Sequence, residues 1–226
     1  MTASNDRPAP DRSAAGSSSP AKLVKDAGPL REHYGEPLEM ALALHKPALD
    51  ALHRRFIAHS PFICLATADA SGQPSVSPKG DAPGFVRVLD DRTLLIPDRP
   101  GNRKIRGLEN MVQNDRIALI FMIPGVSETL RVEGRARITL DDKLLESGRV
   151  DGKNPPAAIV IEIDLVYIHC GKAMVRSRLW DEDSRVAPGT VPSLAEFIVT
   201  QDGASTDTGL EKIEALVDHV YKDELY

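Results

Sequence analysis

The sequence predicts a mainly β protein: a small antiparallel barrel of six or so strands with helical additions. Two observations support this prediction. Short runs rich in β-branched and aromatic residues recur through the middle of the chain, and Gly, Pro, Asn and Asp separate them. Only two short helices are expected between these runs. The strand-like runs cover residues 62–67, 74–77, 85–89, 93–96, 116–123, 128–138 and 157–169.

The composition restricts the class of protein. Hydrophobic residues make up 42% of the chain and charged residues 27%, which is ordinary for a soluble globular domain. Because the net charge is −5, we expect no general attraction to nucleic acid or to an acidic membrane. The two cysteines fit a reducing compartment better than a disulfide framework. No apolar run approaches the roughly 20 residues of a membrane span, and no signal-peptide core is found at the start. We therefore expect a cytoplasmic protein.

The two ends of the chain differ in composition from its middle. Residues 1–28 are mostly Ser, Ala, Pro, Asp and Gly, so we expect a disordered tail. Residues 29–60 carry Leu, Met and Phe at helical spacing, and Pro47 divides this segment into two helices. The barrel domain is expected at 61–180. A helical extension is expected at 181–226, because its last part is amphipathic.

The connection IPDRPGNRK, residues 96–104, has an unusual density of cations. A turn explains its prolines and glycine, but it does not explain Arg99, Arg103 and Lys104 together. Arg103 offers a planar fork that matches two phosphate oxygens, and Lys104 adds a point charge. One interpretation is an anion site. The other is a solvated loop whose cations only keep the protein soluble.

A helix is expected directly after this connection, at about residues 102–113. Asn102 is a competent N-cap, and Gly101 would let the backbone approach a ligand closely. Arg103 and Lys104 would then lie in the first turn, where free N–H groups and the helix dipole favour anions.

The order of these motifs resembles that of the pyridoxamine 5′-phosphate oxidase-related family, the FMN-binding split barrels. A strand–turn–strand unit is followed by SPKGD, a hairpin, IPDRPGNRK, a helix, a further strand and ETLRVEGRA. The resemblance covers roughly residues 38–180 and points to a subgroup whose substrate is not established. It implies a six-stranded antiparallel split β-barrel with FMN as its cofactor.

The resemblance also implies which residues hold the flavin. In the family, a strand–loop–helix junction rich in Ser, Asn, Arg and Lys holds the phosphate, and a later strand places a polar side chain at the flavin edge. SPKGD could equally be a polar hairpin loop, and the later strand's polar residues could form a solvent-facing ladder. No catalytic residue is assigned, because a flavin carries the chemistry itself. The cofactor-binding candidates are Ser77, Lys79, Pro97, Asn102, Arg103, Lys104, Thr129 and Arg131.

The segment GKAMVRSRLW, residues 171–180, contains the single tryptophan. Trp180 could stack on the flavin ring of a neighbouring subunit, with Arg176 or Arg178 holding an anionic substrate. Alternatively, this segment is a helix whose tryptophan caps the barrel and whose arginines are exposed. Family members generally hold the flavin in a cleft between two subunits. The resemblance therefore implies a homodimer and a small-molecule substrate.

Three functional classes remain open. We favour an FMN-dependent oxidoreductase that transfers hydride between a small molecule and the flavin. The same barrel could hold a deazaflavin or haem, and for haem His169 is the only strand-borne histidine. A non-enzymatic flavin-binding protein is the third class. The spacing of histidines and cysteines predicts no metal site.

Overall fold

The computed structural model describes residues 23–201, 207–223 and 225–226. The chain divides into two units, one ending at Leu42 and the other running from Ala43 to Tyr226. The tail expected at residues 1–28 lies almost entirely outside the described residues. Helices α1 (Gly28–Tyr34) and α2 (Glu39–Ala43) contain no buried residue.

Helix α3 (Ala51–His59) follows α2 after a short extended stretch that contains Pro47, so the predicted division into two helices is found. Asp50 caps α3, because its side chain accepts the N–H groups of Leu52 and His53. Just before the cap, the backbone of Lys46 pairs with Val166 in an isolated antiparallel bridge.

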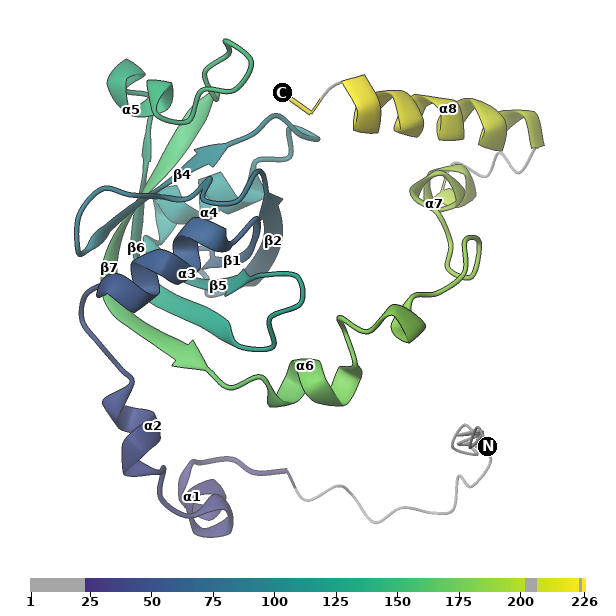
Figure 1. Ribbon diagram of the computed structural model, residues 1–226. Coiled ribbons are helices and arrows are strands. Elements are labelled where there is room, and N and C mark those ends of the chain that lie inside the picture. Colours follow the sequence, from purple (N-terminus) through teal and green to yellow (C-terminus); the bar gives the residue numbers. More distant parts are fainter. Residues whose placement is uncertain (1–22, 202–206, 224) are drawn as a thin grey trace, which may run out of the picture. The chain divides into compact units, whose positions relative to one another are not determined.

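Seven antiparallel strands form one sheet in the order β2-β1-β5-β6-β7-β4-β3 (Figure 1). The expected antiparallel split barrel is confirmed. The difference from six strands is explained by β3, which is only two residues long. In chain order the strands are β1 (Phe62–Ala68), β2 (Pro74–Gly80), β3 (Arg87–Val88), β4 (Thr93–Asp98), β5 (Arg116–Met122), β6 (Thr129–Thr139) and β7 (Ala157–His169).

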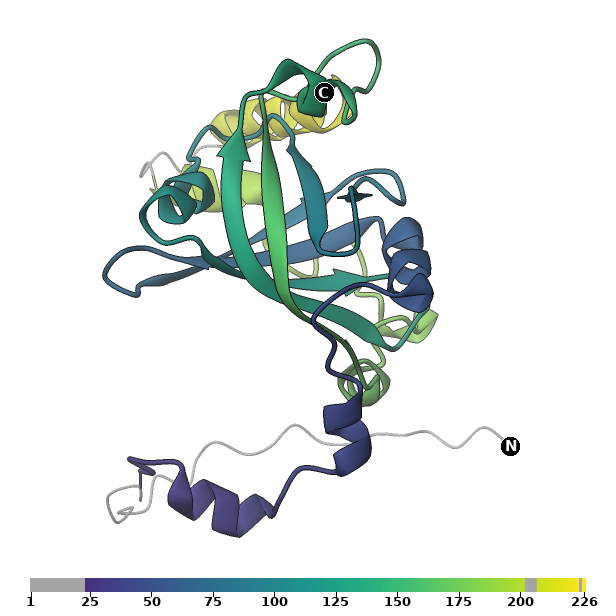
Figure 2. The ribbon, with the colours of Figure 1, turned by 90° about the vertical axis from the view of Figure 1, so that its left-hand side faces the viewer.

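The hydrophobic core fills the inside of the curved sheet, which Figure 2 shows from the side with the long strands β6 and β7 in front. Every second residue of β1, β5 and β6 is buried, as the period of two of a strand requires. Burying one large apolar side chain is worth about 1.5–3 kcal/mol, so this inner face stabilises the fold strongly. Its largest members include Ile63, Leu65, Leu119, Phe121 and Leu130.

Two short helices pack on the sheet. Helix α4 (Arg106–Gln113) contacts β1, β2 and β6 and contributes Met111 to the core. It also buries Asn110, whose amide donates to the Thr67 hydroxyl at 3.0 Å. Helix α5 (Asp142–Glu146) packs Leu145 in a second, smaller apolar cluster with residues of β4 and β7.

The chain after β7 is helical or irregular, as expected. It comprises α6 (Lys172–Ser177), a short 3-10 helix (Glu182–Ser184), α7 (Leu194–Gln201) and α8 (Asp207–Asp223). Helices α7 and α8 contact each other, and α8 is the amphipathic segment predicted from the sequence. Within the described parts of the chain, no helix combines the length and the apolar character needed to cross a membrane.

Candidate functional site: a cationic cleft at the split of the barrel

A cleft of about 890 Å³ opens between β2, the end of β4, the connection after β4 and the first turns of α4. It brings together SPKGD and PDRPGNRK, the two motifs singled out in the sequence. We call it the cationic cleft. Its polar and charged lining residues are Ser75, Ser77, Lys79, Asp98, Arg99, Asn102, Arg103, Lys104 and Arg106.

Strand β2 presents its polar side chains to the cleft because of its alternation. Ser77 pairs with Leu65 of β1, and Leu65 belongs to the core, so Ser75, Ser77 and Lys79 share the inner side of the sheet. The outward positions include two prolines, which a strand tolerates here because β2 is at the edge of the sheet.

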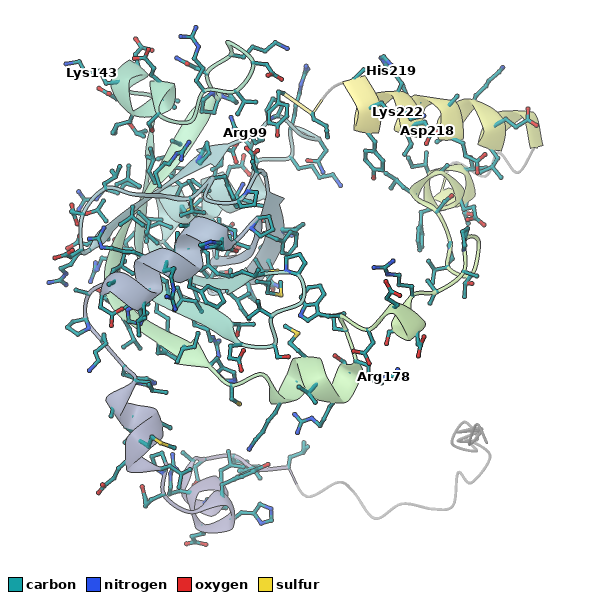
Figure 3. All side chains as sticks on the ribbon, viewed as in Figure 1. Arg99, Lys143, Arg178, Asp218, His219 and Lys222 are labelled. Carbon is teal, nitrogen blue, oxygen red and sulfur yellow. The ribbon has the colours of Figure 1, made fainter. Side chains whose placement is uncertain are left out.

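Two ion pairs bridge the split of the barrel. β2 ends the sheet on one side, while β4 lies next to the short terminal strand on the other. Lys79 Nζ lies 2.6 Å from Asp98 Oδ1, and Arg99 Nε lies 2.6 Å from Asp81 Oδ2. Arg99, labelled in Figure 3, also donates through Nη1 to the carbonyl of Gly148 at 2.7 Å. Side-chain charges, not backbone hydrogen bonds, therefore join the end of β2 to the end of β4.

Asp81 is the most deeply buried of these four charged groups, with 3% of its side chain exposed. Burial by itself raises the pKa of Asp81. Hydrogen bonds from the Tyr226 hydroxyl, the Ala82 N–H and Arg99 outweigh burial and hold that pKa below its usual value. Asp81 is thus a carboxylate that compensates the charge of Arg99.

Arg103 and Lys104 differ from Lys79 and Arg99. Both are exposed at the cleft, and neither side chain makes a hydrogen bond or ion pair with any residue that the structure describes. Lys79 and Arg99 are already compensated by carboxylates. The positive charge left for a bound anion therefore comes from Arg103 and Lys104, together with Arg106 at the start of α4, whose charge adds to the hydrogen bond from Ser71 in lowering the pKa of Asp69.

The helix after the connection begins later than predicted, at Arg106 instead of about residue 102. The prediction that Asn102 caps this helix was wrong. Its side chain instead accepts the Lys104 N–H at 3.0 Å within the loop, and Ile105 is at the N-cap position. Arg103 and Ile105 have φ values of 58° and 37°, and these left-handed residues interrupt the helical path.

The later start does not remove the anion-binding character of the helix end. The first N–H groups of an α-helix have no carbonyl partner within the helix. Here they belong to Arg106 and Gly107, and both residues line the cleft. Backbone donors and unpaired cations thus converge on one part of the cleft.

The chemistry of the cleft is that of a binding site. Of the described residues that line it, none is a His, Cys, Tyr or Glu, and Asp98 is engaged by Lys79. Ser75 and Ser77 therefore have no neighbouring general base in the lining. A bound cofactor could supply redox chemistry at this place.

Two predicted flavin residues do not line the cationic cleft. Thr129 is buried at the start of β6, and Arg131 lies two residues on, on the same outer side of the sheet. The Arg131 guanidinium lies 5.6 Å from the ring centroid of Tyr167, whose hydroxyl donates to Glu133. Arg131 lies near Glu133, as in the alternative of a solvent-facing ladder, whereas Thr129 is buried and does not face solvent.

The three cross-subunit candidates also lie outside the cleft. Arg176 is exposed on α6, and Arg178 (Figure 3) pairs with Asp181 at 2.8 Å. The Trp180 indole N–H donates to the carbonyl of Val126 at 2.9 Å, so the ring is half-buried against the loop between β5 and β6. Their proposed role toward a second subunit stays a prediction.

Some residues at or beside the cleft were not predicted from the sequence. Ser75 could have been found, because it lies two positions before Ser77 on the same strand face. The partners Asp81 and Asp98 could not, since no local pattern shows that the ends of β2 and β4 meet. The cleft is lined by all the remaining candidates, which are Ser77, Lys79, Pro97, Asn102, Arg103 and Lys104.

A second cavity of about 630 Å³ lies beside α3 and has a mainly apolar lining. It contains Phe56, Leu130 and Ile168, and it shares no lining residue with the cationic cleft.

Comparison with known proteins agrees with this fold. The model of the family described as pyridoxamine 5′-phosphate oxidase matches residues 49–170, more than half of the chain. No curated protein matches. Among solved structures, HupZ from Group A Streptococcus is 22% identical, and the match covers 53% of this chain and 93% of HupZ with a TM-score of 0.44.

Two further solved structures match a similar share of the chain. General stress protein 26 from Bacillus anthracis is 19% identical, with 50% of this chain and 88% of that chain covered and a TM-score of 0.38. An FMN-binding protein from Syntrophomonas wolfei is 11% identical, with 57% and 88% covered and a TM-score of 0.40. The family match and the split-barrel sheet lead to one conclusion: the chain belongs to the pyridoxamine 5′-phosphate oxidase family of FMN-binding split barrels.

Proposed function

We propose that the protein is an FMN-dependent oxidoreductase that holds the phosphate of FMN in the cationic cleft. The observation that carries this proposal is the pair of uncompensated cations, Arg103 and Lys104, next to the open N-terminus of α4. A phosphate monoester carries about −1.5 to −2 charges at neutral pH. Two unpaired cations and free backbone N–H groups match that charge.

The other residues of the cleft have complementary roles in this proposal. The hydroxyls of Ser75 and Ser77 supply neutral donors beside the cations. The apolar part of the lining includes Phe85 and Met111, which suits an aromatic ring system. Bound FMN supplies hydride-transfer chemistry, and the chain supplies position and electrostatic complementarity. The substrate is a small molecule that reaches the flavin.

We also propose that the protein is a homodimer formed through the outer face of the sheet. Two rows of half-exposed or exposed apolar residues cross that face, and no described helix packs a buried side chain against them. One row consists of the paired neighbours Pro78, Cys64 and Ile120. The adjacent row consists of Val76, Ala66 and Ala118. A broad apolar face of this kind marks a protein interface, and a second copy can cover it with the same face.

A cytoplasmic location is supported by both cysteines being free thiols, with Cys170 exposed.

The first experiment is an absorbance spectrum of the purified protein, followed by release and chromatography of anything coloured. Bands characteristic of a flavin and the release of FMN are expected. A deazaflavin or a haem spectrum would contradict the proposal and favour another cofactor in the same barrel.

The second experiment tests the phosphate site. In the double variant R103A/K104A, the affinity for FMN should fall at least about 100-fold, because each charge-assisted hydrogen bond is worth roughly 1.5–3 kcal/mol. The matched control replaces two exposed cations outside the cleft, R137A/K143A, and should bind as the wild type does (Lys143 is labelled in Figure 3). Flavin titration of the apoprotein measures both. Equal affinity in the two double variants would rule out the phosphate site.

A further inference from the structure

Tyr226, which follows α8, makes three contacts with the barrel unit. Its hydroxyl donates to Asp81 Oδ1 at 2.8 Å. Its ring centroid lies 5.3 Å from the guanidinium carbon of Arg99, within the range of a cation–π interaction. Its main-chain oxygen accepts a hydrogen bond from Lys153 Nζ at 3.0 Å. In Figure 1, the letter C that marks this end of the chain lies beside the barrel.

Tyr226 therefore touches both members of one ion pair that bridges the split. The two oxygens of Asp81 are divided between two partners, since Oδ2 binds Arg99 and Oδ1 accepts the Tyr226 hydroxyl. Arg99 has its Nε directed to Asp81, its Nη1 to the Gly148 carbonyl, and its π-face near the Tyr226 ring. The guanidinium is thus held from several directions.

This arrangement affects the cationic cleft directly. Arg99 lines the cleft and lies in the same connection as Arg103 and Lys104, only a few residues before them. If Arg99 were free to move, the connection would lose one of its fixed ends, and Arg99 itself would become a further mobile cation at the cleft. The contacts of residue 226 are therefore made at Arg99, within the same stretch, residues 99–104, that presents Arg103 and Lys104.

We propose that Tyr226 is a positioning residue of the cationic cleft: it holds the Asp81–Arg99 pair in place and thereby fixes the connection that presents Arg103 and Lys104. The effect on cofactor affinity rests on the proposed function. The contact and its effect on the connection do not.

The test compares two tyrosines that follow one another closely in the chain. Y226A removes the ring and the hydroxyl, and Y226F removes the hydroxyl alone. Y221A and Y221F are the matched controls, because Tyr221 lies on α8, is 60% exposed and makes no side-chain hydrogen bond, ion pair or ring contact with any described residue. Circular dichroism and thermal melting show whether each variant is folded.

The first readout needs no flavin. Amide hydrogen exchange of residues 98–105 should be at least about tenfold faster in Y226A than in Y221A, the loss expected when one hydrogen bond to a charged group is removed. Y226F should give an intermediate rate, because it keeps the ring over Arg99. Equal exchange in Y226A and Y221A would overturn the proposal.

The second readout is FMN affinity of the apoprotein. We expect a several-fold weaker affinity in Y226A and unchanged affinity in Y221A. If the wild type itself fails to bind FMN while the exchange rates still differ, the positioning role is supported and the proposed cofactor is rejected. If FMN binds equally well to Y226A and Y221A, the positioning role at the cofactor site is overturned while the proposed function stands.

Discussion

Four of the five cations that line the cationic cleft form two chemically different pairs. Lys79 and Arg99 each have a carboxylate partner at 2.6 Å, whereas Arg103 and Lys104 have none among the described residues. The charges of Lys79 and Arg99 are neutralised within the fold. The charges of Arg103 and Lys104 are available for a ligand. Substitutions at the two kinds of position should therefore have different consequences.

This difference can be measured from the free energy of unfolding alone. In Lys79→Met, Asp98 loses its partner although only 16% of its side chain is exposed. Removing one member of a buried pair typically costs 3–5 kcal/mol, and partial exposure reduces the expected loss to about 2–3 kcal/mol. Arg103→Ala should change the free energy of unfolding by less than about 0.5 kcal/mol, as for an exposed side chain. Urea denaturation of both variants provides the values, and equal losses would contradict the division into structural and ligand-binding cations.

The residues of the cleft show what a sequence can and cannot reveal at this scale. Ser77 and Lys79 could be predicted from the resemblance of the SPKGD motif, and the alternation of β2 then places both on the inner side of the sheet. Arg103 and Lys104 could be predicted because a turn does not need them. The pairing of Arg99 with Asp81 could not be predicted, since it depends on the closure of the sheet. Tyr226 is separated from Asp81 by 145 residues, and nothing in its local sequence indicates that contact.

Among the elements, the connection before α4 differs most from its prediction. Caps and composition favoured a helix from about residue 102, and α4 starts at Arg106. A helix prediction assumes right-handed backbone, but Arg103 and Ile105 are left-handed. Such conformations cost energy in residues other than glycine and persist where the surrounding structure imposes them. The strands were easier to predict, because β1 and β5 bury every second residue and β4 is a short continuous apolar run between turn residues.

The segment after α8 should respond to alkaline pH. The hydrogen bond to Asp81, then burial, then the charge of Asp81 raise the pKa of Tyr226 above its usual value of about 10. The charge of Arg99 lowers the pKa of Tyr226, and the charge of Asp151 raises it further. The charged Lys153 also lies nearby, where its Nζ donates to the main-chain oxygen of Tyr226. The protonated Tyr226 hydroxyl therefore contributes its full share to the free energy of unfolding below about pH 10. This contribution is lost as the pH rises through the pKa of Tyr226 in the folded protein.

The measurement is the free energy of unfolding of the wild type and of Y226F between about pH 9 and pH 11.5. Phenylalanine cannot ionise, and the other tyrosines titrate in both proteins. We therefore expect the wild type to lose more stability than Y226F over this interval. Parallel curves would show that the Tyr226 hydroxyl does not lie against a carboxylate.

For the whole molecule, the outer face of the sheet is the feature that a single chain leaves unexplained. A homodimer through this face should be broken by Ile120→Glu, because this change places a charge in the middle of an apolar row. Leu140→Glu is the control, since Leu140 follows the end of β6 and is 72% exposed.

Light scattering after size-exclusion chromatography measures the mass of each variant. A dimer is expected for the wild type and the control, and a monomer for Ile120→Glu. If the wild type is a monomer at micromolar concentration, the proposed interface is rejected. The mass of the control shows whether any added charge, and not one on this face, disrupts the assembly.

The bridging of the barrel by two ion pairs has a consequence for how such a protein can diverge. Neighbouring strands in a sheet are held at about 4.8 Å by their backbone hydrogen bonds, whatever their side chains. The span between the ends of β2 and β4 has no such fixed value, because it is set by the lengths of Lys79, Asp81, Asp98 and Arg99. Exchanging an aspartate for a glutamate there would lengthen the span by about one carbon–carbon bond without shifting any strand register. Single substitutions in these ion pairs can therefore change the width of the opening between β2 and β4 and leave the rest of the fold unchanged. That width limits the size of the molecule that can enter the cleft.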